Sequence, residues 1–181
     1  MKKEIEGIII ECVEGDITKQ EGFEAVVNAA NSRLAPGGGV AGAIHQAAGP
    51  KLYEECRKLS PIKTGEEVIT AGYNLPNPYI IHTLGPVYHQ EEEPDKKLKQ
   101  CYQNCLKVAE TKGLKSIAFC AISTGIFGYP LKEGLKIGLG TIVENIPKLR
   151  SLKRIRMVIY GQDALRVCEE VFKEITKEST I

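Results

Sequence analysis

The stretch from Asn28 to Gly49 holds the residues of this chain best suited to bind a ligand; it reads N-A-A-N-S-R-L-A-P-G-G-G-V-A-G-A-I-H-Q-A-A-G. Two asparagines follow a short apolar strand, and Gly37–Gly39 then precede a helix of small residues. Glycine brings no side chain to a core and costs backbone entropy, so such a run is useful where backbone N–H groups must approach a ligand closely. The helix N-terminus supplies further free N–H groups and a partial positive charge. This pattern predicts a site for a phosphate or diphosphate.

The residues Gly37–Gly42 match G-x-G-x-x-G, but the surroundings argue against two common nucleotide-binding families. A dinucleotide-binding motif should directly follow its strand, and an acidic residue should stand about 20 positions further along the chain. Here residues 29–36 separate the strand from the glycines, and the nearest later acids, Glu54 and Glu55, lie in a helical stretch. A nicotinamide dehydrogenase is therefore disfavoured. A nucleoside-triphosphate loop is disfavoured too, because no Gly-Lys-Ser/Thr follows.

Three further segments follow predicted strands and carry small or polar residues, namely Gly15–Thr18, Ser123–Gly128 and Tyr160–Gln162. The second could be a plain strand-to-helix turn or a second phosphate cradle of backbone N–H groups. Its aromatic Phe127, which could cover a sugar, favours the cradle. Asp16 could bond only its own turn, and Tyr160 could be ordinary core edge or could stack on a base.

Two histidines and an asparagine have competing interpretations. His45 lies about one and a half turns into the glycine-headed helix, close to the predicted phosphate site. A lone histidine in a small-residue helix is more often structural, but this position keeps His45 a candidate. His82 lies among β-branched neighbours and is interpreted as structural, and Asn28 could serve only to connect loops.

The elements that would position these loops form an α/β pattern. Strands are predicted over residues 5–14, 25–28, 67–73, 79–84, 116–122 and 155–160; helices over 40–48, 51–58 and 131–145, and around the apolar spacings of 98–109 and 165–175. This order predicts one domain, residues 1–181, with helices on both faces of a mixed sheet. Ligands in such sheets bind where loops leave the C-terminal strand ends, so the four segments should converge.

Composition narrows the function classes. The net charge is +1 and the basic residues are scattered, which disfavours a nucleic-acid partner. No apolar run is long enough to span a bilayer, and no apolar signal region follows Met1–Glu4, so we expect a cytoplasmic protein without a membrane partner. The six cysteines include no C-x-x-C pair and the three histidines suggest no metal site, so we expect free, buried thiols and no metal.

Five ordered motifs together resemble the macro domain family over nearly the whole chain. They are G-D-I-T at 15–18, N-A-A-N at 28–31, G-G-G-V-A-G-A-I at 37–44, I-H-T-L-G-P at 81–86 and I-S-T-G-I-F-G-Y-P at 122–130. The resemblance is greatest to mono-ADP-ribosyl hydrolases and O-acetyl-ADP-ribose deacetylases. It implies a three-layer α/β/α fold and a site for ADP-ribose, free or as part of an ADP-ribosylated protein or O-acetyl-ADP-ribose, with no cofactor.

The resemblance also implies roles for individual residues. Asp16 would accept a hydrogen bond from the adenine amino group, backbone N–H groups of the two glycine-containing loops would hold the diphosphate, and Asn31 would bind the distal ribose. The implied ligand-binding residues are Asp16, Ile17, Ala30, Asn31, Gly38, Gly39, Val40, Ser123, Thr124, Gly125, Ile126, Phe127, Gly128 and Tyr160; the implied catalytic residues are Asn31 and His45.

One position departs from that branch. Its hydrolases commonly carry Asp after G-G-G-V, and here Ala41 stands there. Two hypotheses follow: a hydrolase of ester-linked ADP-ribose in which the substrate's diphosphate and Asn31 position a water, or a non-catalytic ADP-ribose reader. A carboxylate leaving group needs no strong general acid, which suits the first hypothesis. A third class, a scaffold or RNA-binding module, has little support because no basic stripe appears.

Overall fold

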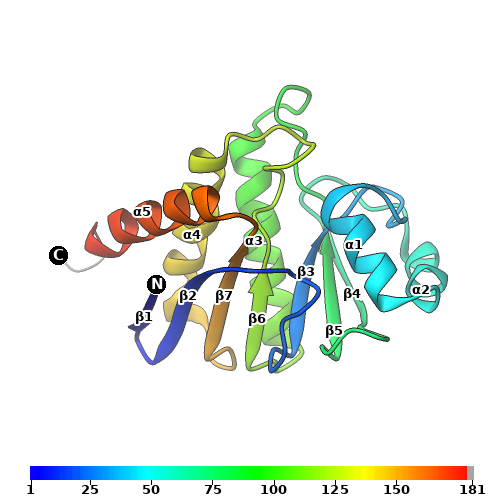
Figure 1. Cartoon of the computed structure of the whole chain (residues 1–181), viewed down its shortest axis with the longest axis horizontal. Coiled ribbons are helices and arrows are strands. Elements are labelled where there is room, and N and C mark those ends of the chain that lie inside the picture. Colours follow the sequence, from blue (N-terminus) through cyan, green and yellow to red (C-terminus); the bar gives the residue numbers. More distant parts are fainter. Residues whose placement is uncertain (179–181) are drawn as a thin grey trace.

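The computed structural model describes residues 1–178, and they form a seven-stranded mixed sheet covered by helices (Figure 1). The predicted domain extends to residue 181, and its last three residues lie outside the described part. The strands are β1 (Lys2–Ile5), β2 (Ile8–Glu14), β3 (Ala25–Ala29), β4 (Glu67–Ala71), β5 (Tyr79–Thr83), β6 (Ser116–Phe119) and β7 (Arg154–Ile159). Their spatial order is β1-β2-β7-β6-β3-β5-β4. The five inner strands run parallel, and the two edge strands, β1 and β4, are antiparallel to their neighbours.

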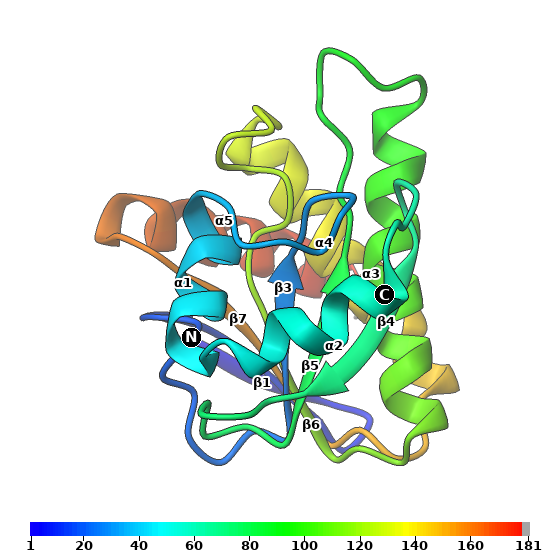
Figure 2. The ribbon, with the colours of Figure 1, turned by 90° about the vertical axis from the view of Figure 1, so that its right-hand side faces the viewer.

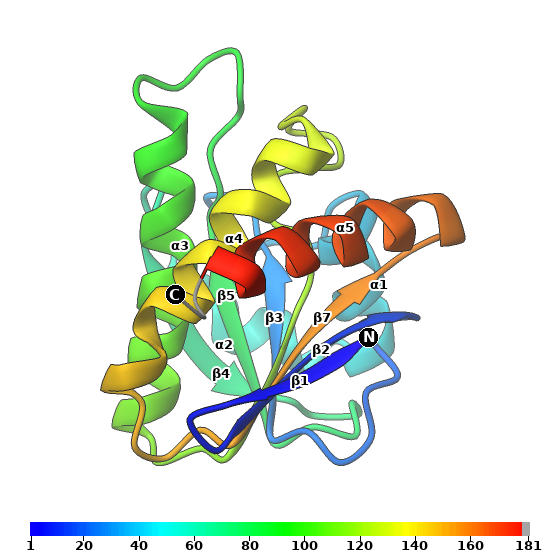
Figure 3. The same ribbon diagram turned by 90° about the vertical axis from the view of Figure 1, so that its left-hand side faces the viewer.

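Helices cover both faces of this sheet, as the sequence predicts. They are α1 (Gly39–Ala48), α2 (Lys51–Leu59), α3 (Pro94–Thr111), α4 (Leu131–Asn145) and α5 (Gln162–Glu178), with a short 3-10 turn at Ile146–Lys148. The pair α1 and α2 lies on one face (Figure 2). The group α3, α4 and α5 lies on the other face (Figure 3). The result is the predicted three-layer α/β/α fold with a mixed central sheet.

The core lies in two apolar layers, one on each side of the sheet. Strand β3 is buried along Ala25–Val27, as expected for an inner strand with both faces covered. Helix α3 buries the predicted stripe at spacings of three and four: Leu98, Cys101, Tyr102, Cys105, Leu106 and Ala109. All six cysteines are free and buried, which confirms the expectation from their spacing. No helix among the described residues is long and apolar enough to cross a membrane.

Most boundaries lie within two residues of the prediction, and two predicted strands differ by more, each for a local reason. The predicted strand over residues 5–14 is a hairpin, because Glu6 and Gly7 adopt positive φ angles of 49° and 82° and turn the chain between β1 and β2. The predicted strand over 116–122 ends at Phe119, because the chain leaves the sheet there and enters the loop that carries Ser123.

Candidate functional site

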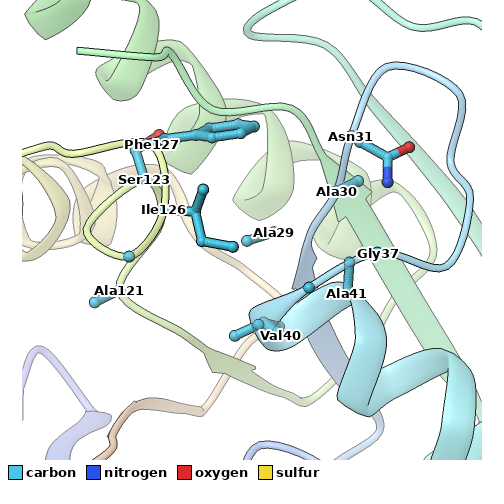
Figure 4. A pocket seen from close by; sticks show the side chains of 13 residues that line it. Ala29, Ala30, Asn31, Gly37, Val40, Ala41, Ala121, Ser123, Ile126 and Phe127 are labelled. Atoms are coloured by element: carbon cyan, nitrogen blue, oxygen red, sulfur yellow. The ribbon is translucent and has the colours of Figure 1, made fainter.

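Two adjoining pockets lie at the C-terminal ends of the parallel strands, around the N-terminus of α1. The first, about 170 Å³ in volume, is shown in Figure 4 and is lined by Ala29, Ala30, Asn31, Gly37, Gly38, Gly39, Val40, Ala41, Ala121, Ser123, Gly125, Ile126 and Phe127. The second, about 390 Å³, is lined by Gly15, Asp16, Ile17, Gly39, Val40, Ala43, Cys120, Val158 and Tyr160. Both share Gly39 and Val40, so they adjoin at the N-terminus of α1, and together, here called the groove, they are of the size that small-molecule ligands occupy.

The shared wall is the N-terminus of α1, and its backbone is built to receive an anion. Gly38 is the N-cap residue and provides no side-chain hydrogen bond to the helix. The first turn contains no acidic residue, so its N–H groups are neither capped nor neutralised by a side chain. Unpaired N–H groups and the positive end of the helix dipole together favour a phosphate at this place.

Close backbone packing holds the glycine loop against this helix. A Cβ atom at Gly42 would lie 2.2 Å from the carbonyl oxygen of Gly37, which no real side chain tolerates. A Cβ atom at Gly37 would lie 3.2 Å from Nδ2 of Asn31. Gly39 has a φ of +59°, a left-handed conformation that glycine adopts without strain. The glycines therefore let the loop, the helix and Asn31 meet at van der Waals distance.

Asn31 lines the first pocket and also closes its own turn. Its Nδ2 donates to the carbonyl oxygen of Ala35 at 2.8 Å, and its Oδ1 accepts from the Ala35 N–H at 3.0 Å. One amide hydrogen and one acceptor lone pair remain for a ligand. The turn thus fixes the direction of the side chain and leaves it capacity for a hydroxyl group.

The loop from Ala121 to Gly128 forms the opposite wall of the first pocket. Figure 4 shows Ile126 and Phe127 on this side, facing Asn31, Val40 and Ala41. Ser123 is buried with a φ of +68°, a strained angle for a residue with a side chain. The carbonyl of Phe127 accepts from the Tyr88 N–H at 2.9 Å, which ties this wall to the loop after β5.

Asp16 and Tyr160 lie at the far end of the groove, in the second pocket. Oδ1 of Asp16 accepts hydrogen bonds from Thr18 Oγ1 at 2.7 Å and from the Thr18 N–H at 2.9 Å. These two hydrogen bonds lower the pKa of Asp16, so its carboxylate is an ionised acceptor at neutral pH. Tyr160 is 90 % exposed, which leaves its ring free to stack on a flat ligand.

The comparisons with known proteins agree with this geometry. Residues 27–138 match the family model "Macro domain". The O-acetyl-ADP-ribose deacetylase of Escherichia fergusonii is 44 % identical over 87 % of this chain and 92 % of its own length. The chain belongs to the macro domain family.

Two further comparisons extend the match. The ADP-ribose glycohydrolase MACROD2 of Mus musculus is 49 % identical over 74 % of this macro domain, which spans only 28 % of that longer protein. A solved structure of an Oceanobacillus iheyensis macrodomain variant with ADPR superposes with a TM-score of 0.94 and 38 % identity, covering 98 % of both chains.

The macro domain brings twelve of the fourteen predicted ligand-binding residues into the two pockets. The two exceptions are Thr124 and Gly128, which support the loop. Thr124 Oγ1 donates to the carbonyl of Ala121 at 2.8 Å, and Gly128 takes a φ of +74° where the loop turns.

His45 lies outside both pocket linings, and its role as a catalytic residue stays a prediction. Its side chain is buried on the sheet-facing side of α1, one turn beyond Ala41. The ring makes an edge contact with Tyr53 at a centroid distance of 6.2 Å, and burial lowers its pKa. The imidazole therefore packs against Tyr53 of α2, one helical turn from the pocket-lining Ala41.

Several lining residues of the macro domain escape sequence reasoning because they are small and apolar. Ala29, Ala121, Ala43 and Val158 contribute only shape, and nothing in their type marks them. Cys120 also lines the second pocket, but burial raises the pKa of its thiol to about 12, so it is no nucleophile at neutral pH.

The first pocket lacks acid–base groups. Its thirteen lining residues, all within the described part of the chain, include two polar side chains, Asn31 and Ser123, and none that titrates near neutral pH. Ala41 is buried and lines this pocket, so its methyl group stands where a carboxylate would face the ligand. Among residues 1–178, no cluster of three or more His, Cys, Asp or Glu side chains could hold a metal ion.

Proposed function

We propose that this macro domain binds ADP-ribose and releases it from ester-linked substrates, either ADP-ribosylated Asp or Glu side chains or O-acetyl-ADP-ribose. The observation that carries the proposal is the pair of adjoining pockets around the N-terminus of α1, with an ionised Asp16 in one and Asn31 in the other. The base, the diphosphate and the distal ribose of ADP-ribose would occupy three parts of this groove in that order. Relatives named O-acetyl-ADP-ribose deacetylase and ADP-ribose glycohydrolase support it.

The chemistry we propose follows from the lack of acid–base groups around the first pocket. No lining side chain can take a proton from water near neutral pH, so a diphosphate oxygen of the substrate is the base closest to the reacting carbon. Asn31 would hold the distal ribose and the water in line. The water would form a bond to the ribose carbon that carries the ester and give a proton to the diphosphate oxygen, while the bond from that carbon to the ester oxygen breaks. The leaving carboxylate has a pKa of about 4 and departs without protonation. A glycoside to a hydroxyl or guanidine group would need an acid that this pocket does not offer.

The direct test measures binding and turnover separately. Calorimetry with ADP-ribose is expected to show saturable binding, and purified protein is expected to release ADP-ribose or acetate from the two ester substrates. Asn31→Ala should lower kcat by tenfold or more, since it removes the group that orients the ribose. Absence of ADP-ribose binding would refute the whole proposal. Binding without turnover, with Asn31→Ala unchanged, would refute the catalytic part.

A second candidate, a non-catalytic reader of ADP-ribose, is favoured specifically by Ala41. The residue occupies the third position of α1, where a carboxylate would be stabilised by the helix dipole. Ala41→Asp is therefore expected to fold and to raise the rate of ester hydrolysis by about 10² or more, as a positioned acid–base group does. Such a gain over a negligible natural rate would favour the reader, whereas a small gain over a substantial natural rate would favour the substrate-assisted hydrolase.

A further inference from the structure

A buried glutamine supports the Asp16 end of the groove from behind. Gln20 is 5 % exposed, and its Nε2 donates to the carbonyl oxygen of Asp16 at 2.7 Å. Its Oε1 accepts from Nη1 of Arg156 at 2.9 Å. Gln20 therefore links strand β7 to the backbone of the residue whose carboxylate faces the second pocket, although Gln20 itself does not line that pocket.

The arginine in this link is itself held on two sides. Arg156 forms an ion pair with Glu11 at 3.1 Å, and its guanidinium lies over the ring of Phe23 at 4.5 Å from the centroid. Glu11 also accepts from Nε of Arg154 at 2.8 Å. Because Glu11 and Phe23 are both buried, the guanidinium has a fixed position and gives the Gln20 amide a fixed direction.

Asp16 depends on this support because its side chain and its backbone are held together. Oδ1 is occupied by the two hydrogen bonds from Thr18, so the carboxylate moves with the turn that carries it. The turn's carbonyl oxygen at Asp16 accepts from the Lys19 N–H at 3.0 Å and from Gln20. Without the Gln20 donor, the Asp16 carbonyl would keep only the Lys19 N–H, a bond within the turn, and the sheet would hold the turn through the neighbouring Gly15 N–H, which donates to the Ile159 carbonyl oxygen at 2.9 Å.

Resting on the proposed binding of ADP-ribose, we infer that Gln20 is a positioning residue that sets the preference of this site for adenine over 6-oxopurines. Adenine presents an amino donor at its 6-position, whereas hypoxanthine presents a carbonyl oxygen. A carboxylate attracts the first and repels the second, but only when it is held at hydrogen-bond distance. If the turn could move away from the base, the carboxylate would no longer lie at hydrogen-bond distance, and both bases would bind almost equally.

The test compares ADP-ribose with its inosine counterpart by calorimetry. The wild-type protein is expected to prefer ADP-ribose by tenfold or more, the worth of one hydrogen bond to a charged group. Gln20→Leu should weaken ADP-ribose binding about tenfold and leave the inosine compound nearly unchanged. Asn104→Leu is the matched control, because Asn104 also donates to a loop carbonyl, that of Gly65 at 2.7 Å, away from both pockets. It should retain the wild-type preference.

A second variant keeps the test decisive if Gln20→Leu does not fold. Gln20→Glu has the same shape and pairs with Arg156, but it has no hydrogen to donate to the Asp16 carbonyl. It should also lose the preference. The inference is overturned if the wild type binds both compounds equally, or if it discriminates and both folded variants discriminate as well as it does. A wild type that binds neither compound refutes the proposed function instead.

Discussion

At the scale of single residues, the groove depends on glycines, which lack a Cβ atom, as much as on residues with side chains. Gly42 lies in the interior of α1, where alanine would ordinarily stabilise a helix by about 1 kcal/mol. Here a Cβ atom would lie 2.2 Å from the Gly37 carbonyl oxygen. The overlap would outweigh the helix propensity, since forced overpacking costs about 1–3 kcal/mol.

Gly42→Ala is therefore expected to lower the free energy of unfolding and to push the glycine loop out of place, weakening ADP-ribose binding tenfold or more. Denaturant unfolding and calorimetry measure the two effects. Gly140→Ala in α4 is the control, because a Cβ atom there would have no neighbour within 4 Å. It should be neutral or stabilising, with wild-type binding. Equal effects of both substitutions would disprove the close-approach argument.

At the scale of elements, the N-terminus of α1 is left uncapped where a stable helix would have a capping side chain. Gly38 is in an extended conformation, φ −86° and ψ 173°, that any residue can adopt. Aspartate at this position would accept hydrogen bonds from the first-turn N–H groups and interact favourably with the helix dipole. The same carboxylate would occupy the place we assign to the diphosphate.

Gly38→Asp should consequently keep or slightly raise the free energy of unfolding and abolish ADP-ribose binding. Like charges at such a contact cost several kcal/mol, which corresponds to a loss of 100-fold or more. Gly38→Ala separates charge from size, because its Cβ atom meets the same neighbour, Cδ1 of Ile126 at 3.1 Å. A loss of binding as large in Gly38→Ala as in Gly38→Asp would show that steric crowding, not charge, governs this position.

The elements themselves were largely predictable, because each depends on local pattern. The apolar spacing of α3, the bounds of α4 and, to within one residue, the ends of β3 and β7 follow from periodicity and from turn residues. The hairpin of β1 was missed, although Glu6-Gly7 is a two-residue turn signal, because the apolar run on either side of it reads as one strand.

At the scale of the whole molecule, sequence reasoning found the loops of the site but could not find what supports them. The link from Gln20 to Arg156 joins residues 136 positions apart, and neither local pattern nor residue type indicates it. His45 stays a prediction: its place along the chain, close to the glycine loop, suggests a role, and it shares the buried side of α1 with Ala41, which lines the first pocket. The contacts that support a loop, and the direction in which a helical side chain points, are set by the packed fold.

A second buried polar network crosses the sheet and makes the stability of the whole fold depend on pH. Nδ2 of Asn28 on β3 donates to Nδ1 of His82 on β5 at 3.0 Å, and the Nε2 of His82 lies 2.9 Å from Thr70 Oγ1 on β4. Thr70 Oγ1 donates to the Ala71 carbonyl, so it accepts from Nε2 and the ring is neutral. Burial, with a smaller contribution from His45, lowers the pKa of His82 to about 3.

The sign of the pH effect follows from this shift. The unfolded chain protonates His82 below about pH 6.5, while the folded chain resists protonation down to about pH 3, so stability is complete above pH 6.5 and declines between those values. The free energy of unfolding should fall by about 1.4 kcal/mol per pH unit in that window from His82, and His45 adds in the same direction.

Denaturant unfolding from pH 8 to pH 4 measures this slope. His82→Gln should reduce it by about that amount, whereas His89→Gln, at an exposed position, should leave it unchanged. A slope that is the same in all three proteins would show that carboxylates, and not this histidine, govern the acid stability of the fold.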